Sequence, residues 1–367
     1  MKEPTRVAGR VLGLMALAIR AAVTPGVACS SSTPRPASRR SRNAALCSVA
    51  APRRAAGAVP TLRGDDWARL IIRGYQPGIA PGNVSDCTGA AVRWQEPTMR
   101  CRETPYESGP GPQRPITDDD VVISRAGGNL RLVWVIVDRY VDRVPTPDGS
   151  YRLEDGEAVG PVALTEFQGD RVVVRAIGTL RTLPRRPRLR LMPIGDRRVL
   201  VAEGEICRDN NDPRTCRRQG RLLMLQGHRF VAEPLRSQSG RCLGPARFEY
   251  AKETQRTLEE TGWLRTFELQ TSAEYRDQGV QVHEQVTVTD SDPRRPAVPP
   301  RVFRRAASDR AIYVIGNAFV ASEPSLWSRV LRVDARTGRV RDGGVEDAGD
   351  AGDADDESDM DFIDGGM

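Results

Sequence analysis

The chain has 367 residues, of which 39% are hydrophobic, and a formal net charge of +7. Of its 55 basic residues only Lys2 and Lys252 are lysine, a ratio that indicates a GC-rich genome rather than selection for phosphate contacts. The basic excess lies in a low-complexity arm without a groove-reading or aromatic motif, so we expect no nucleic-acid partner.

The amino-terminal 28 residues have the three parts of an export signal. A basic start, MKEPTRVAGR, precedes the apolar run VLGLMALAI and the small residues TPGVA. The apolar run has nine residues, far fewer than the roughly 20 that cross a bilayer as a helix. We therefore interpret residues 1–28 as a signal peptide and expect no permanent transmembrane anchor.

Four residues at the end of this segment, Gly26, Val27, Ala28 and Cys29, precede a run of serines. They resemble the lipobox of bacterial lipoproteins, whose cysteine is acylated and becomes the new amino terminus. The resemblance covers residues 1–32 and implies lipid attachment at Cys29, a membrane partner through that anchor, and a place in the cell envelope as an outer-membrane lipoprotein. Cleavage by an ordinary signal peptidase at the same bond and an uncleaved cytoplasmic chain are the alternatives.

Composition divides the rest of the chain into three parts. Residues 29–63 are rich in Ser, Pro, Arg and Ala, which predicts a disordered basic linker. Residues 64–340 are predicted to form a single mainly β domain, irregular and disulfide-stapled over 64–118. Residues 341–367 carry eleven acidic side chains and one arginine, which predicts a disordered acidic tail.

Export changes how the seven cysteines are interpreted. If Cys29 is acylated, six remain, and in an oxidising compartment an even set usually pairs. Cys207 and Cys216 bracket a turn between two strand-like runs, and Cys87 and Cys101 bracket a segment of little regular structure, so we predict these two bridges. Cys242 is left to pair with Cys47 or to remain free.

Strand-like runs dominate the predicted domain. The segment 119–141 holds two β-branched runs split by Gly127 and Gly128, which predicts a hairpin. Within residues 129–137 both alternating faces are apolar, which predicts a strand covered on both sides. Three later hairpins turn at Gly169, Gly195 and Gly227, and a longer one spans 264–290.

The predicted fold is therefore mainly β, an antiparallel sandwich or barrel-like meander of about 12 strands. The end of the segment 310–340 is similar to the hairpins of β-propeller blades, so a β-propeller is the alternative. One short helix is predicted within 244–263, where Pro245 stands at a start position and Gly262 at a stop position.

Few residues suggest chemistry. The only histidines are His228 and His283, and neither lies in a metal-ligand or nucleophile motif. Glu284 shares one strand face with four valines, where burial disfavours its charged form unless a partner is present. Glu284 is thus a candidate catalytic acid, although a structural pair with one of the many arginines is the favoured interpretation.

The segment between Cys207 and Cys216 offers four oxygen-bearing side chains, Asp209, Asn210, Asn211 and Asp212. Their consecutive order lacks the alternation of a calcium loop, so we predict an exposed binding loop rather than a metal site. Close cysteine pairs and histidines at zinc spacing are absent from the sequence, and we expect neither metal nor cofactor.

Two functions remain open at this point. The first is a lipid-anchored, non-enzymatic binding domain of the cell envelope that presents loops to a protein or glycan. The second is an exported hydrolase of glycan or peptide, which would need two carboxylates facing a common cleft.

Overall fold

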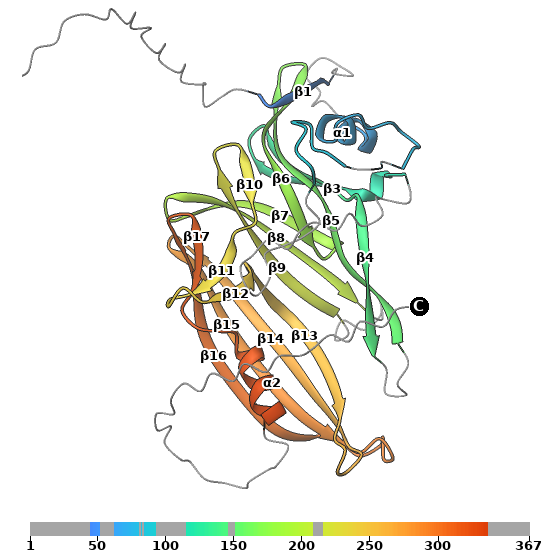
Figure 1. The fold of residues 1–367 in the computed structure, drawn as a ribbon, viewed down its shortest axis with the longest axis vertical. Coiled ribbons are helices and arrows are strands. Elements are labelled where there is room, and N and C mark those ends of the chain that lie inside the picture. Colours follow the sequence, from blue (N-terminus) through green and yellow to red (C-terminus); the bar gives the residue numbers. More distant parts are fainter. Residues whose placement is uncertain are drawn as a thin grey trace, which may run out of the picture. The chain divides into compact units, whose positions relative to one another are not determined.

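The computed structural model describes residues 45–51, 62–80, 82, 84–92, 115–145, 151–207 and 216–336. These residues belong to one compact unit. Their 17 strands form a single, largely antiparallel sheet that does not close on itself, and two α-helices pack against it (Figure 1). The predicted mainly β fold with a sandwich-like meander is confirmed, with more strands than the 12 or so expected.

The first layer of this sheet is built from the first six strands. They are β1 (Cys47–Ala50), β2 (Val121–Gly127), β3 (Leu130–Val135), β4 (Asp138–Pro145), β5 (Tyr151–Gln168) and β6 (Arg171–Thr182). Strands β2, β3, β5 and β6 are neighbours in that order, while β4 pairs with β5 and β1 with β6. The β2–β3 turn holds Gly127 and Gly128 at φ of 104° and 51°, left-handed backbone that glycine adopts without strain, and the predicted hairpin is confirmed.

Strand β3 lies between two hydrophobic clusters, as its sequence predicted. The cluster shared with the second layer takes Leu132, Trp134 and Ile136. The cluster shared with helix α1 (Gly64–Ile71) takes Val133, Val135 and Val137. Because side chains alternate across a strand, a run that is apolar on both faces has to be covered on both faces.

The second layer consists of β7 (Arg185–Ile194), β8 (Arg197–Cys207) and β9 (Cys216–Gln226). The short strand β10 (Arg229–Val231) pairs in parallel with β6 and antiparallel with β9, so it joins the first two layers. The turn glycines Gly169, Gly195 and Gly227 have φ of 61°, 62° and 59°, and the recurring hairpin that they predicted is confirmed.

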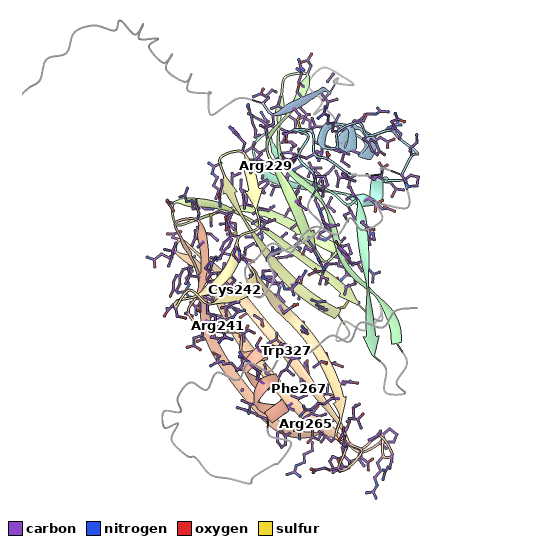
Figure 2. The ribbon with its side chains drawn as sticks, viewed as in Figure 1. Arg229, Arg241, Cys242, Arg265, Phe267 and Trp327 are labelled. Atoms are coloured by element: carbon purple, nitrogen blue, oxygen red, sulfur yellow. A yellow bond between two sulfur atoms is a disulfide. The ribbon has the colours of Figure 1, made fainter. Side chains whose placement is uncertain are left out.

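The third layer continues from β9 by antiparallel pairing. It comprises β13 (Arg247–Thr257), β14 (Leu264–Arg276), β15 (Gly279–Ser291), β16 (Arg301–Ile315) and β17 (Ala318–Ala321), followed by β11 (Pro234–Ser237) and β12 (Cys242–Pro245). One part of its buried face packs against β8 and β9. The other part is covered by helix α2 (Leu326–Arg336), whose Trp327 packs near Phe267 of β14 (Figure 2).

Helix α2 lies where the similarity to a propeller blade predicted a β-hairpin. Leu326, Trp327 and Val330 recur at helical spacing and enter the cluster with β14 and β15. The similarity of the segment 330–340 to a propeller blade is therefore misleading over residues 330–336. The remaining residues of that segment lie outside the described residues.

The predicted helix within 244–263 is wrong, because residues 247–257 form β13. Tertiary pairing outweighs the helix propensity of this polar segment: β9 binds one edge of β13 and β14 the other. The proposed stop residue Gly262 does have a φ of +70°, but it lies in the β13–β14 turn.

The predicted linker 29–63 also contains structure. Strand β1 within it pairs with residues 171–174 of β6, and Leu62 packs against the cluster around α1. The folded part therefore begins upstream of residue 64. Its segment 64–118 includes α1 and the short 3₁₀ helix η1 (Asp118–Asp120).

Candidate functional site

The predicted bridge between Cys207 and Cys216 is confirmed, and it joins the ends of β8 and β9. The predicted bridge between Cys87 and Cys101 is wrong, because Cys87 pairs with Cys47. The reason is β1, whose pairing with β6 brings Cys47 against the hydrophobic cluster that Cys87 also contacts. Cys101 lies outside the described residues.

Cys242 is also disulfide-bonded. Both alternatives that the sequence left open for it, a pairing with Cys47 and a free thiol, are therefore wrong, since Cys47 is bonded to Cys87. The lipid-attachment residue Cys29 and the predicted binding loop Asp209, Asn210, Asn211 and Asp212 lie outside the described residues as well.

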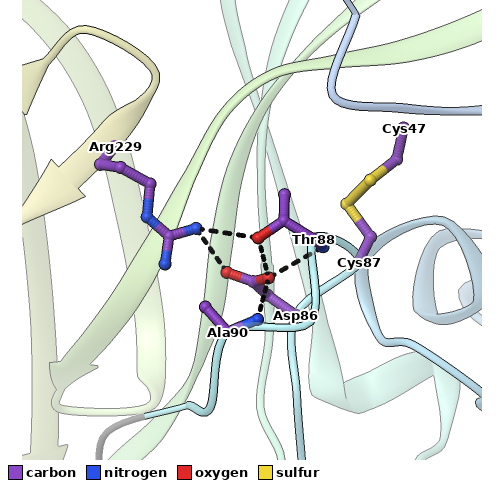
Figure 3. Close-up of a disulfide and its surroundings, with 6 residues drawn as sticks. All are labelled: Cys47, Asp86, Cys87, Thr88, Ala90 and Arg229. Atoms are coloured by element: carbon purple, nitrogen blue, oxygen red, sulfur yellow. Dashed lines mark hydrogen bonds and ion pairs between the residues drawn. A yellow bond between two sulfur atoms is a disulfide. The ribbon is translucent and has the colours of Figure 1, made fainter.

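Asp86 organises the turn beside the Cys47–Cys87 bridge (Figure 3). Its Oδ1 accepts hydrogen bonds from the Thr88 N–H at 2.9 Å, the Thr88 hydroxyl at 2.5 Å and the Ala90 N–H at 3.1 Å. Its Oδ2 accepts from Arg229 of β10 at 2.6 Å. The carboxylate therefore ties the disulfide-linked segment to the junction of the first two layers.

Glu284, the candidate catalytic acid, is buried and fully engaged. Arg310 Nε donates to its Oε1 at 3.0 Å, the Ser325 hydroxyl donates to the same oxygen at 2.9 Å, and the Leu326 N–H donates to Oε2 at 2.6 Å. Because α2 begins at Leu326, the carboxylate also lies where the helix dipole favours negative charge. Glu284 thus forms the structural pair that the sequence favoured, and it anchors α2.

The same arrangement recurs at every buried carboxylate among the described residues, since each is bound by arginine. The other four pairs are Asp86–Arg229, Asp120–Arg139, Glu157 with Arg181 and Arg247, and Asp290–Arg265. A glycan hydrolase needs two carboxyl groups that are free to exchange protons with a substrate. The described residues offer no such buried pair.

Glu157 of β5 connects four strands. It accepts from Arg181 of β6 at 2.6 Å, Arg247 of β13 at 2.8 Å and Gln219 of β9 at 3.0 Å. Burial alone would raise the pKa of this carboxyl, but the two guanidinium groups and Gln219 outweigh burial and hold the pKa below its ordinary value. The charged form of Glu157 therefore stabilises the junction of the three layers.

Two tyrosines share the carboxylate of Glu203 on β8. The hydroxyls of Tyr250 and Tyr275 donate to its Oε1 at 2.6 and 2.8 Å, and Arg190 also donates to that oxygen. Burial, followed by the bond to Glu203, raises the pKa of Tyr250 well above its ordinary value. The neutral tyrosines therefore donate hydrogen bonds to a charged carboxylate and link β8 to β13 and β14 of the third layer.

Neither histidine lies in a nucleophile–base arrangement. His228 Nδ1 is 3.0 Å from the Arg175 carbonyl oxygen, and His283 Nδ1 is 2.7 Å from Asp309 on an exposed part of the sheet. Within the described ranges, no group of three or more His, Cys, Asp or Glu side chains is placed to hold a metal ion. Among the helices described, none has the length and apolar character to cross a bilayer.

One exposed surface stands apart from these engaged networks. We define the arginine tip as the β13–β14 turn (258–263), the β15–β16 turn (292–300) and the first five residues of β16 (301–305). Both turns lie at the same end of the third layer (Figure 1). They also adjoin, because a Cβ placed on Gly262 would lie 3.4 Å from a guanidinium nitrogen of Arg294.

The arginine tip combines exposed apolar and cationic side chains. Trp263, Val298, Val302 and Phe303 are 36%, 57%, 46% and 45% exposed, half of the large hydrophobic residues that are exposed in the described chain. The arginines of the tip are residues 294, 295, 301, 304 and 305, all exposed. None of these residues is among the site residues predicted from the sequence, although the stretch PRRPAVPPRVFRR, residues 293–305, combines arginines with apolar side chains.

A buried ion pair lies at the base of the tip. Arg265 binds Asp290 through two hydrogen bonds of 2.7 Å, and its guanidinium lies 3.9 Å from the centre of the Phe303 ring. Figure 2 places Arg265 at this end of the third layer. Arg265 is buried and held by both hydrogen bonds to Asp290, so its cation–π contact orients the ring of Phe303.

Comparisons with protein-family models, with curated proteins and with solved structures gave no match to this chain.

Proposed function

We propose that this protein is an exported, lipid-anchored, non-enzymatic binding protein of the bacterial cell envelope. Its anchor is Cys29, and its binding surface is the arginine tip. The arginine tip replaces the loop 209–212 as the leading candidate surface. The reason is that the tip lies within the described residues and its side chains are exposed, whereas the loop lies outside them.

The observation that carries the binding function is the contrast between the tip and the interior. The buried carboxylates described above are engaged by arginine, whereas the tip exposes large apolar side chains beside arginines. Exposed apolar side chains concentrated at one place mark interaction surfaces in soluble domains. Binding rather than catalysis is the function that such a surface serves.

The cysteines support the compartment. All five described cysteines are disulfide-bonded, which is typical of oxidising environments such as the periplasm. Seven is an odd number, so one cysteine of the chain is left over when the others pair within it. An acylated Cys29 accounts for that leftover cysteine.

Intact-mass analysis of the membrane fraction tests this proposal. We expect a chain that begins at Cys29, carries a diacylglyceryl group and stays with the membrane after a high-salt wash. A C29S variant should keep its disulfides and be released from the membrane fraction by the same high-salt wash. An unprocessed chain in the cytosol with free thiols would contradict the proposal.

A further inference from the structure

We propose that the arginine tip docks on the surface of an anionic lipid bilayer, with the turn 292–300 and Trp263 entering the headgroup region. This inference rests on the proposed function only in taking the tip as the binding surface. It adds the chemical class of the partner, a phospholipid bilayer with acidic headgroups.

The exposed apolar side chains of the tip have the identity and the position expected of residues that enter a bilayer surface. Trp263 and Val298 lie on adjoining turns at the end of long strands, and Val302 and Phe303 lie at the start of β16. Trp is enriched at the headgroup level of membranes, where its ring is partly apolar and its N–H remains wet. Turns at the end of a sheet can enter a bilayer surface without moving the strands behind them.

The backbone of residues 293–300, in the β15–β16 turn, has few N–H groups that would need water. Four of its eight residues are prolines (293, 296, 299 and 300), which have no N–H to desolvate. The N–H of Arg294 donates to Asp292 Oδ1, that of Arg295 to the Asp292 carbonyl and that of Val298 to the Arg295 carbonyl.

Ala297 is therefore the one residue of 293–300 whose N–H makes no hydrogen bond within the described residues. An unsatisfied N–H in a low-dielectric medium costs several kcal/mol, so a turn that has almost none can leave water at small cost. An interface with a protein, which supplies its own hydrogen-bond acceptors, would not require this depletion.

The third argument is charge. The side chains of Arg301, Arg304 and Arg305 make no hydrogen bond or ion pair within the part of the chain that the structure describes. Asp292 is already used in capping the turn backbone and lies 4.0 Å from Arg295. The remaining acids of the tip, Glu259 and Glu260, lie on the other turn, so the start of β16 is the cationic side that faces phosphate groups.

Vesicle sedimentation of the exported full chain with the C29S substitution tests the proposal, because no attached lipid can then retain it. We expect binding to phosphatidylglycerol vesicles and little to phosphatidylcholine vesicles. Substituting Arg301, Arg304 and Arg305 by Gln should weaken binding about five-fold for each arginine, on the order of one hundred-fold together. The matched control replaces Arg125, Arg188 and Arg198, which are exposed on β2, β7 and β8 and have no ion pair among the described residues.

The apolar contribution has its own pair of variants. V298S should weaken vesicle binding on the order of tenfold, whereas I315S, which removes an equally exposed side chain outside the tip, should not. Lipids that carry a quencher near the headgroup should reduce the tryptophan fluorescence of the bound protein. The W263F variant should lose the part of this quenching that comes from Trp263.

Equal binding to both vesicle types, or an equal loss in the two triple-arginine variants, would overturn the inference. Binding to a soluble polyanion that V298S leaves unchanged, with no vesicle binding, would assign the tip to an acidic polymer instead. These results are independent of acylation at Cys29, so failure of the anchor and failure of the tip are distinguished.

Discussion

At the scale of single residues, the protein depends on arginine for charges that lie inside the fold. Arginine has a planar fork of donors that bind both oxygens of a carboxylate, as Arg265 does with Asp290. The strong arginine bias of the sequence was interpreted as codon usage. The structure shows that several of these arginines also neutralise buried acids.

Replacing Glu284 by Gln should destabilise the protein by about 3 to 5 kcal/mol, because Arg310 would be left buried without a counter-charge. Urea denaturation monitored by circular dichroism measures the change. The control is E274Q, since Glu274 and Arg276 form an exposed pair that solvent screens. A loss as small as that of the control would contradict the anchoring role of Glu284.

Glu157 predicts a pH dependence with a definite sign. Its pKa in the folded protein lies below the ordinary value of 4.5, so the unfolded chain takes up a proton first as the pH falls. Stability from this group is therefore complete above about pH 4.5 and is lost as the pH falls toward the folded pKa.

Comparison of urea midpoints at about pH 7 and about pH 3.5 tests this expectation. The E157Q variant should be less stable at the higher pH and should lose less on acidification than the unmodified protein. The exposed carboxyl of Glu268 provides the control, and E268Q should follow the unmodified protein at both values.

At the scale of elements, hydrophobic alternation identified strands where burial is simple. Strand β3 and the glycine-turned hairpins were predicted because their apolar spacing and turn chemistry agree with their environment. Strand β13 was missed because its polar, helix-favouring residues pair with β14 along one edge and with the more distant β9 along the other. Helix α2 was missed because the stretch VLRVDARTGRV, with the β-branched Val330 and Val333, is similar to a propeller hairpin.

Close approach of strands makes Gly160 of β5 a sensitive position. A Cβ there would lie 1.8 Å from the Val135 carbonyl oxygen, where β3 ends. We expect G160A to cost at least about 1 to 3 kcal/mol, since the backbone of Val135 and Val137 or that of β5 has to move. Thermal unfolding gives the comparison with G82A, for which a Cβ meets nothing within 4 Å and little change is expected.

At the scale of the whole molecule, one disulfide ties β1 to the segment around Cys87 and another joins the ends of β8 and β9. The Cys47–Cys87 bridge spans a sequence separation of 40 and the Cys207–Cys216 bridge one of 9. In the chain-entropy model the longer loop contributes about 4 kcal/mol and the shorter about 2.5 kcal/mol.

Paired serine substitutions should reproduce that order. The C47S/C87S variant should lose more stability in urea than C207S/C216S, because its unfolded chain gains more freedom. The opposite order would show that β1 remains on β6 without its bridge and that Arg229 and Asp86 suffice to hold the segment.

The candidate site was less predictable than the fold. The place of Glu284 among valines identified it as a buried carboxylate, and an arginine was expected as its partner. Its contacts with Ser325 and Leu326 could not be predicted, because these residues lie more than 40 positions further along the chain. The arginine tip unites two turns separated by a whole hairpin, so no local pattern joins Trp263 to Arg294. The Cys47–Cys87 bridge was likewise missed, because Cys47 lies in β1 and the composition of residues 29–63 predicted a disordered linker there.

The scarcity of lysine has a practical consequence for this fold. Lys2 lies in the predicted signal segment, so the mature chain would carry one side-chain amine, Lys252, which lies 5.6 Å from the centre of the Trp327 ring of α2. Burial lowers the pKa of that amine, which raises its nucleophilic fraction while the helix covers it. The rate at which an amine-reactive label modifies Lys252, measured at that residue and apart from the α-amino group of the chain, therefore reports how often α2 lifts from the sheet.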